Sequence, residues 1–191
     1  ALTYSATLSS GDALPAWLTF NANTRTFSGT PANADVGPIT VRVTATDGSS
    51  ATVTDDFVLT VTNVNEAPSI TSSATASVAE NATAVMTVTG TDPDAGASLT
   101  YSILAGGDGA KFAINPTTGA LTFVTAPNFE APTDGGTNNV YDVTVQISDG
   151  TNTATQAIAV SVTDVNEAPS ITSSATASVA ENTTAVMTVT G

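Results

Sequence analysis

The chain has 191 residues, with 17 acidic and three basic side chains, a net charge of −14, and neither cysteine nor histidine. This charge makes nucleic acid and anionic membrane surfaces poor partners, because both are bound through lysine and arginine. The missing cysteine excludes disulfides and thiol chemistry, and no apolar run approaches the roughly 20 residues needed for membrane insertion.

The strand pattern is visible along the whole chain. Apolar residues alternate with polar ones over residues 39–45 and 57–61, and again over 141–147 and 158–162. No stripe with a 3.6-residue period competes with this alternation, and Thr, Ser, Ala, Val and Gly dominate the composition. Short strands bounded by turn residues predict an all-β fold of tandem immunoglobulin-like, antiparallel β-sandwiches.

Two interior segments match each other and predict the same hairpin. Residues 20–27 correspond to residues 114–121, and each segment places an apolar residue on both sides of an Asn-containing turn. Residues 2–4 correspond in the same way to residues 99–101. The two units are therefore expected to share this interior hairpin.

An internal repeat sets the domain organisation. Residues 64–90 recur as residues 165–191, 101 positions later, with Ala82 replaced by Thr183 as the single change. A period near 100 residues is too long for a solenoid and fits whole domains in a row. We expect an incomplete domain without its first strands at 1–63, a complete domain at 64–166, and the opening strands of a next repeat at 167–191.

Carboxylates gather at the expected strand ends of the complete domain. We expect one group at each pole: Glu80, Glu130, Asn166 and Glu167 at one, and Asn65, Glu66, Asp92, Asp94 and Asp149 at the other. Crowded like charges are costly unless a cation neutralises them. Ligand sets made only of oxygen suit Ca²⁺, whereas zinc and copper would favour His or Cys. The sequence therefore predicts Ca²⁺ at the joints between domains.

These motifs resemble the cadherin family and its bacterial relatives over residues 63–191. Glu80 matches the family's first-strand Glu, and Asp164–Pro169 match its linker. The other matches are Glu130 in P-N-F-E, the Asp92/Asp94 pair and Asp149 in S-D-G. The first unit resembles the variant cadherin-like module of large bacterial surface proteins and of the dystroglycan ectodomain, with Asp35 in the place of Glu130 and Asp47 in the place of Asp149.

The resemblance implies that Ca²⁺ lies between consecutive domains and stiffens the array into a rod. This chain departs from the family linker at Glu66 and Glu167, where the family has Asp, and at Ala67 and Ala168, where it has Asn. Ser98 also replaces a family Asn. The resemblance therefore implies one or two ions at each joint.

Catalysis has no support, because the chain has no His base, no Cys nucleophile and no glycine-rich phosphate loop. We therefore expect a non-enzymatic, extracellular stalk of a bacterial adhesin or surface fibre that serves cell adhesion or biofilm formation, with neighbouring repeats as its end-to-end partners.

Two alternatives remain open for the function. One is a module that binds surface polysaccharide through an exposed Trp17, although Trp17 fits a core position better. The other is a filament of copies of the chain in which residues 168–191 complete the next molecule. Five other carboxylates fit no site and are expected to be solvated surface residues: Asp55, Asp56, Asp108, Asp134 and Asp142.

Overall fold

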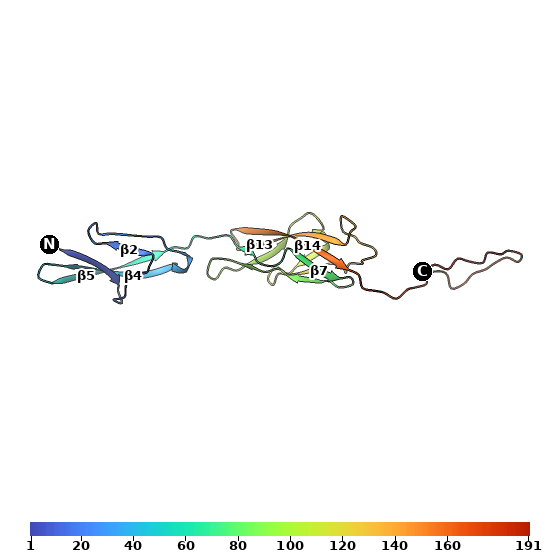
Figure 1. Ribbon diagram of the computed structural model, residues 1–191, viewed down its shortest axis with the longest axis horizontal. Helices are drawn as coiled ribbons and strands as arrows, with labels where there is room; N and C mark the ends of the chain where they lie inside the picture. Colours follow the sequence, from blue (N-terminus) through green and yellow to red (C-terminus); the bar gives the residue numbers. More distant parts are fainter.

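The structure is a computed structural model that describes residues 1–191. Figure 1 shows an elongated molecule in which two β-rich units and a C-terminal tail follow one another along the long axis. Apart from strands, the chain forms only two short 3₁₀ helices, η1 (Asn33–Asp35) and η2 (Gly109–Lys111). No helix is long and apolar enough to cross a membrane. The predicted all-β fold class is confirmed.

The first unit (residues 1–63) has five strands in two small sheets. One sheet has the order β1-β4-β5 and consists of Thr3–Leu8, Gly37–Thr46 and Thr52–Val61. The other is the hairpin of β2 (Leu18–Asn21) and β3 (Thr26–Gly29). Phe20 pairs with Phe27 across this hairpin, with ring centroids 4.7 Å apart. The hairpin predicted at 20–27 is therefore confirmed.

The second unit (residues 64–166) is a more complete sandwich. Its larger sheet has the order β10-β13-β14-β7, formed by Thr100–Ile103, Val140–Ser148, Thr153–Thr163 and Thr75–Ala79. The facing sheet has the order β11-β12-β8, formed by Phe112–Ile114, Ala120–Phe123 and Ala84–Thr87. A short pair of β6 (Ser69–Ile70) and β9 (Gly90–Thr91) closes one end.

One ladder of the second unit is parallel, which the alternation pattern alone does not predict. β7 runs parallel to β14, with Val78 opposite Val162, while the other ladders are antiparallel. The opening segment first pairs through β6 with β9 and then crosses to the larger sheet as β7. β7 is thus fastened to β14, the last strand of the unit, which leads into the next joint.

The hydrophobic core lies in the second unit. Along β13, Tyr141, Val143, Val145 and Ile147 are at most 1% exposed, as their period-two spacing predicts. Tyr141 also packs edge-to-face against Phe123, with ring centroids 5.1 Å apart. Each such buried apolar side chain contributes roughly 1.5–3 kcal/mol to folding. The second unit therefore has the larger share of the hydrophobic stabilisation.

The tail (residues 167–191) forms no strands but keeps some hydrogen bonds of the segment that it repeats. The N–H of Thr172 donates to the carbonyl of Thr190 at 2.9 Å. Thr71 and Thr89 make the same bond at 2.8 Å inside the second unit. Apolar side chains of the tail face solvent, and Ile171 is 77% exposed. The tail is thus an opening segment without the sheets on which its copy packs.

Candidate metal centre

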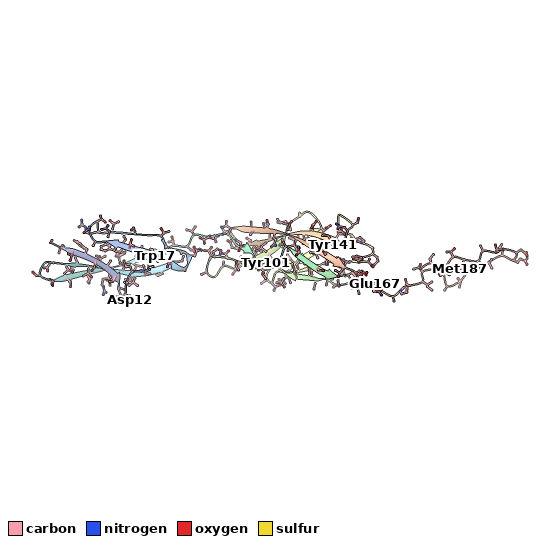
Figure 2. The ribbon with its side chains drawn as sticks, viewed as in Figure 1. Asp12, Trp17, Tyr101, Tyr141, Glu167 and Met187 are labelled. Atoms are coloured by element: carbon pink, nitrogen blue, oxygen red, sulfur yellow. The ribbon has the colours of Figure 1, made fainter.

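Four carboxylates meet at the pole of the second unit that faces the tail. They are Glu80, Glu130, Asp164 and Glu167, and one oxygen from each lies within 4.8 Å of the others. Glu80 follows β7, Glu130 lies in the loop after β12, and the remaining two follow β14. Figure 2 shows Glu167 where β14 leaves the sandwich. Strand ends that are distant in sequence therefore deliver this cluster to one place.

Glu80 is the buried member of the cluster and is held by the backbone. Its side chain is 2% exposed, Oε1 accepts the N–H of Val165 at 2.8 Å, and Oε2 accepts the N–H of Phe129 at 2.9 Å. These two N–H groups, Phe129 foremost, lower the pKa of Glu80 below its ordinary value. Glu80 is thus a fixed anion that joins the exit of β14 to the loop that carries Glu130.

The pKa of Glu130 is shifted in the opposite direction to that of Glu80. A backbone hydrogen bond lowers its pKa, but burial and the charges of Glu80, Glu167 and Asp164 outweigh that bond and raise the pKa overall. The Nδ2 of Asn81 donates to Oε1 of Glu167 at 3.1 Å and offsets part of the local charge. The cluster therefore favours a positive charge among its oxygens.

The geometry of the cluster suits a calcium ion. Calcium–oxygen bonds are about 2.3–2.6 Å long, so two ligands of one ion lie at most about 5 Å apart. The 4.8 Å spread of the four carboxylates falls within this limit. An all-oxygen ligand set also disfavours zinc and copper. The residues present therefore fit Ca²⁺, and backbone carbonyls or water would complete its coordination.

At the opposite pole of the second unit, the linker residues Asn65 and Glu66 contact aspartates of the sandwich. Nδ2 of Asn65 donates to Oδ2 of Asp149 at 3.0 Å, and the N–H of Glu66 donates to Oδ2 of Asp94 at 3.0 Å. The N–H of Asp94 donates to Oδ1 of Asp92 at 2.8 Å. Oδ2 of Asp92 and Oδ1 of Asp94 are buried and have no hydrogen-bond partner. Buried oxygens are costly without a partner, and a cation would satisfy both.

The carboxylates at this pole differ in how strongly neighbouring hydrogen-bond donors stabilise their negative charge. Burial, followed by the neighbouring Asp94, raises the pKa of Glu66. Hydrogen bonding from the Asn63 side chain, followed by the N–H of Glu66, lowers the pKa of Asp94. The N–H groups of Thr151 and Asn152 lower the pKa of Asp149. The pKa of Glu66 is thus raised, whereas the pKa values of Asp94 and Asp149 are lowered, so Glu66 holds a proton more readily than an ordinary glutamate.

One hydrogen bond at this pole crosses between the two units. Nδ2 of Asn33, in η1 of the first unit, donates to Oε2 of Glu66 at 3.0 Å. Because Glu66 also bonds to Asp94 through its backbone, the linker is held from both sides. The first joint therefore has a direct polar contact between the units as well as unpartnered carboxylate oxygens.

Comparison with known families agrees with this architecture. The He_PIG family of Ig domains matches residues 1–62, and the cadherin domain model matches residues 74–179. The latter match covers more than half of the 191 residues. The chain belongs to the cadherin domain family. Cadherin and Ig-like repeats are typically non-catalytic, and cadherin repeats are typically extracellular. No curated protein matches the chain.

Solved cadherin structures share the fold. The fragment EC22-24 of mouse Cadherin-23 gives a TM-score of 0.61 at 23% identity, over 86% of this chain and 53% of that one. Mouse clustered PcdhgC3 EC1-3 gives 0.58 at 23% identity, over 85% and 56%. Human Protocadherin-24 EC1-2 gives 0.58 at 17% identity, over 86% and 83%. The chain thus spans about half the length of the first two structures, and at these identities the likeness shows the fold alone.

Two further predicted ligands are Asp35 in the first unit and Asn166 in the second linker. Asp35 lies in η1, where Oδ2 accepts the N–H of Ala32 at 2.8 Å, and it is outside the four-carboxylate cluster. Asn166 is exposed and donates to the backbone carbonyl of Glu167 at 3.3 Å. Asp164 belongs to the cluster but was not among the predicted ligands. Its position at the head of the D-V-N-E-A-P linker, where the first unit has Asn63, is the signal that could have identified it.

The prediction that Asp134 is a solvated surface residue is wrong. Asp134 is 4% exposed, and it accepts the N–H groups of Gly136, Asn138 and Asn139 at 3.0–3.1 Å. Burial alone would raise the pKa of Asp134, but these bonds outweigh burial and lower it. Its oxygens are already occupied by the loop that surrounds them. Asp134 therefore has a structural role in the cadherin domain.

Proposed function

We propose that this chain is part of a calcium-stiffened stalk in a large extracellular protein, a bacterial adhesin or surface fibre that serves adhesion or biofilm formation. The observation that carries the proposal is the cluster of Glu80, Glu130, Asp164 and Glu167 at the exit of a cadherin domain. The partners of each repeat in such a stalk are its neighbours, end to end. The adhesive surface itself would lie elsewhere in the protein.

The mechanism follows from which elements the cluster joins. Glu80 belongs to the end of β7, Glu130 to a loop, and Asp164 and Glu167 to the linker that leaves β14. Without a cation, repulsion among these groups favours a linker that moves away from the sandwich. A bound Ca²⁺ would turn the repulsion into shared coordination, so the direction of the linker would become fixed.

The first joint supports the same mechanism from the other side. Asp92 and Asp94 follow the short strand β9, and each has a buried oxygen without a partner next to the linker residue Glu66. Glu66 is already bonded to Asn33 of the first unit. A cation on Asp92, Asp94 and Glu66 would tie the linker to the second unit, and the Asn33 contact would pass that restraint to the first.

The proposal is tested by titrating the chain with Ca²⁺ and then with EDTA. Calorimetry should show saturable binding, and small-angle scattering should show a maximum dimension that grows and sharpens with Ca²⁺ and reverts with EDTA. Glu130→Gln should weaken the binding. Asp55→Asn, which removes one exposed charge with no hydrogen-bond partner, should leave it unchanged. Absence of saturable binding, or a scattering profile that ignores Ca²⁺, would overturn the proposal.

A further inference from the structure

A long connection separates β12 from β13 in the second unit. It spans residues 124–139 and contains neither strand nor helix, whereas the corresponding connection of the first unit, from β3 to β4, spans residues 30–36. Connections longer than about 12–15 residues without secondary structure are uncommon in compact domains, and ordered ones are usually functional, for example as binding loops. The second unit therefore carries a loop beyond what its sandwich needs.

Side chains hold this loop in a defined conformation. The N–H of Thr133 donates to the hydroxyl of Tyr141 at 3.1 Å, and the N–H of Ala131 donates to Oδ1 of Asn128 at 2.7 Å. The three N–H groups that Asp134 accepts fix the part of the loop before β13. A site on such a loop is preorganised, so a ligand does not have to order the loop when it binds.

The loop encloses a pocket against the sandwich. The volume of the pocket is about 350 Å³, which is within the range of small-molecule sites. The buried side chains of Phe123 and Tyr141 line it on the side of the core. Figure 2 shows Tyr141 in the part of the second unit nearer to Glu167. The pocket lies inside the complete sandwich, and its walls are all interior residues of the chain.

The lining of the pocket combines C–H surface with hydrogen-bonding groups. Val124 and Pro127 supply apolar surface, and Thr125, Asn128 and Thr133 carry hydroxyl or amide groups. Oδ1 of Asn128 is bonded within the loop, which leaves its Nδ2 as a donor for a ligand. A sugar ring has C–H faces and hydroxyl groups around its edge, so it can use both kinds of lining.

The pocket also holds the one positive charge of the second unit. Lys111 lines it and is the only basic residue among residues 64–166, which include ten acidic ones. It forms no ion pair, since the only salt bridge of the chain lies in the first unit. No acidic residue lines this pocket, whereas another hollow of the unit is lined by Asp108 and Asp142. An ammonium group in such surroundings favours a carboxylate ligand.

We propose that this pocket binds a sugar that bears one carboxylate group, such as a uronic acid residue of a glycan. Nζ of Lys111 pairs with the carboxylate. The hydroxyl groups of the sugar bond to Thr125, Asn128 and Thr133, and Val124 contacts a C–H face of the ring. Such a site lets the stalk itself contact a glycan, in addition to an adhesive surface elsewhere in the protein.

The charge of the second unit limits the ligand to a single carboxylate. Ten acidic residues and one basic residue give residues 64–166 a net negative charge, which repels a polyanion as a whole. One carboxylate on an otherwise neutral glycan gains the contact with Lys111 without most of that repulsion. The pocket shares no residue with the four-carboxylate cluster, so the proposal does not depend on Ca²⁺ binding there.

Nuclear magnetic resonance of the ¹⁵N-labelled chain tests the proposal, with glucuronate as the probe. Glucose serves as the uncharged sugar and acetate as the carboxylate alone, and EDTA in every titration excludes binding through Ca²⁺. Glucuronate should shift the amide signals of Lys111, Thr125 and Thr133 with a dissociation constant on the order of 1 mM, and glucose and acetate should bind roughly tenfold more weakly. No shift of these signals with glucuronate, or equal binding of acetate, would overturn the proposal.

Two matched pairs of variants locate the bound sugar. Lys111→Gln should weaken glucuronate binding roughly tenfold or more, whereas Arg25→Gln removes a positive charge outside the pocket and should leave it unchanged. Ala131→Leu places a larger side chain in the pocket and should reduce binding, whereas Ala113→Leu makes the same change at an exposed position of β11 and should not. Lys111, Ala131 and Ala113 are exposed, so the variants should keep the fold. Equal binding within both pairs would show that the sugar does not occupy this pocket.

Discussion

Glu80 accepts the backbone N–H of Val165 at 2.8 Å, although the two residues are 85 positions apart. The same carboxylate accepts the N–H of Phe129 through its other oxygen. A single buried side chain therefore connects the end of β7 to the linker that follows β14 and to the loop that carries Glu130. The carboxylate-rich pole is assembled around this anchor by protein hydrogen bonds alone.

The anchor predicts a loss of stability when Glu80 is made neutral. Glu80→Gln keeps the shape but replaces one acceptor oxygen by an N–H₂ group, so one of the two backbone donors loses its partner. We expect the melting temperature of the second unit to fall by roughly 5–15 °C, with or without Ca²⁺. Circular dichroism measures it. Glu181→Gln, the same change in the solvated tail, is the control and should leave the melting temperature unchanged.

The same anchor predicts a dependence of stability on pH. The folded-state pKa of Glu80 is lowered, whereas in the unfolded chain it returns to an ordinary value of about 4.3. The unfolded state therefore binds more protons in acid, and the stabilisation by Glu80 is present above about pH 4.3 and lost as the pH falls through the folded pKa. Urea unfolding in EDTA over this range should show the loss, and Glu80→Gln should show less of it.

Glu130 predicts a dependence of folding stability on pH that is opposite in direction to that of Glu80. Its folded-state pKa is raised, so its contribution favours folding below the unfolded pKa and is lost as the pH rises through the folded pKa. At neutral pH in EDTA, Glu130→Gln should therefore raise the melting temperature, by roughly 2–5 °C, because it removes repulsion. In Ca²⁺ the variant should gain less stability than the wild type. Asp55→Asn controls for net charge, and an equal gain there would contradict a local effect.

The strands could be predicted from the sequence because each one shows its pattern locally. The alternation from Tyr141 to Ile147 places four side chains in the core, and the matching turns predict both inner hairpins. The parallel pairing of β7 with β14 has no such local signature, since it depends on a segment that changes sheets. The position of Glu80 at an expected strand end predicts that it lies near the exit of the unit, and the family resemblance agrees with this placement.

Asp134 shows a second limit of the sequence. Its surroundings, T-D-G-G-T-N-N, are polar and rich in glycine, which is typical of an exposed loop. In the structure the loop closes over the side chain, and three backbone N–H groups point at it. A buried carboxylate is tolerated when backbone N–H groups compensate its lost hydration. Whether they do so depends on the conformation of the loop, which the composition of the loop does not reveal.

The closed loop predicts that Asp134 is needed for stability. Asp134→Ala leaves three N–H groups without their acceptor, and we expect the melting temperature of the second unit to fall by roughly 5–15 °C. Asp134→Asn keeps one acceptor oxygen and should cost less. Asp142→Ala removes an exposed carboxylate at the nearby start of β13 and is the matched control. Equal melting temperatures for Asp134→Ala and Asp142→Ala would show that the hydrogen bonds of this loop do not stabilise the second unit.

The raised pKa values of Glu66 and Glu130 predict that Ca²⁺ displaces protons in mild acid. Calcium binds the deprotonated carboxylates, so near pH 5 these two groups must release the protons that they hold more readily than ordinary glutamates. Calorimetry at pH 5 in buffers of different ionisation enthalpy should show heats that depend on the buffer, and near pH 7.5 this dependence should vanish. Calcium affinity should fall as the pH is lowered. Glu130→Gln should reduce the number of protons released, and heats independent of buffer at both pH values would show that neither carboxylate is a ligand.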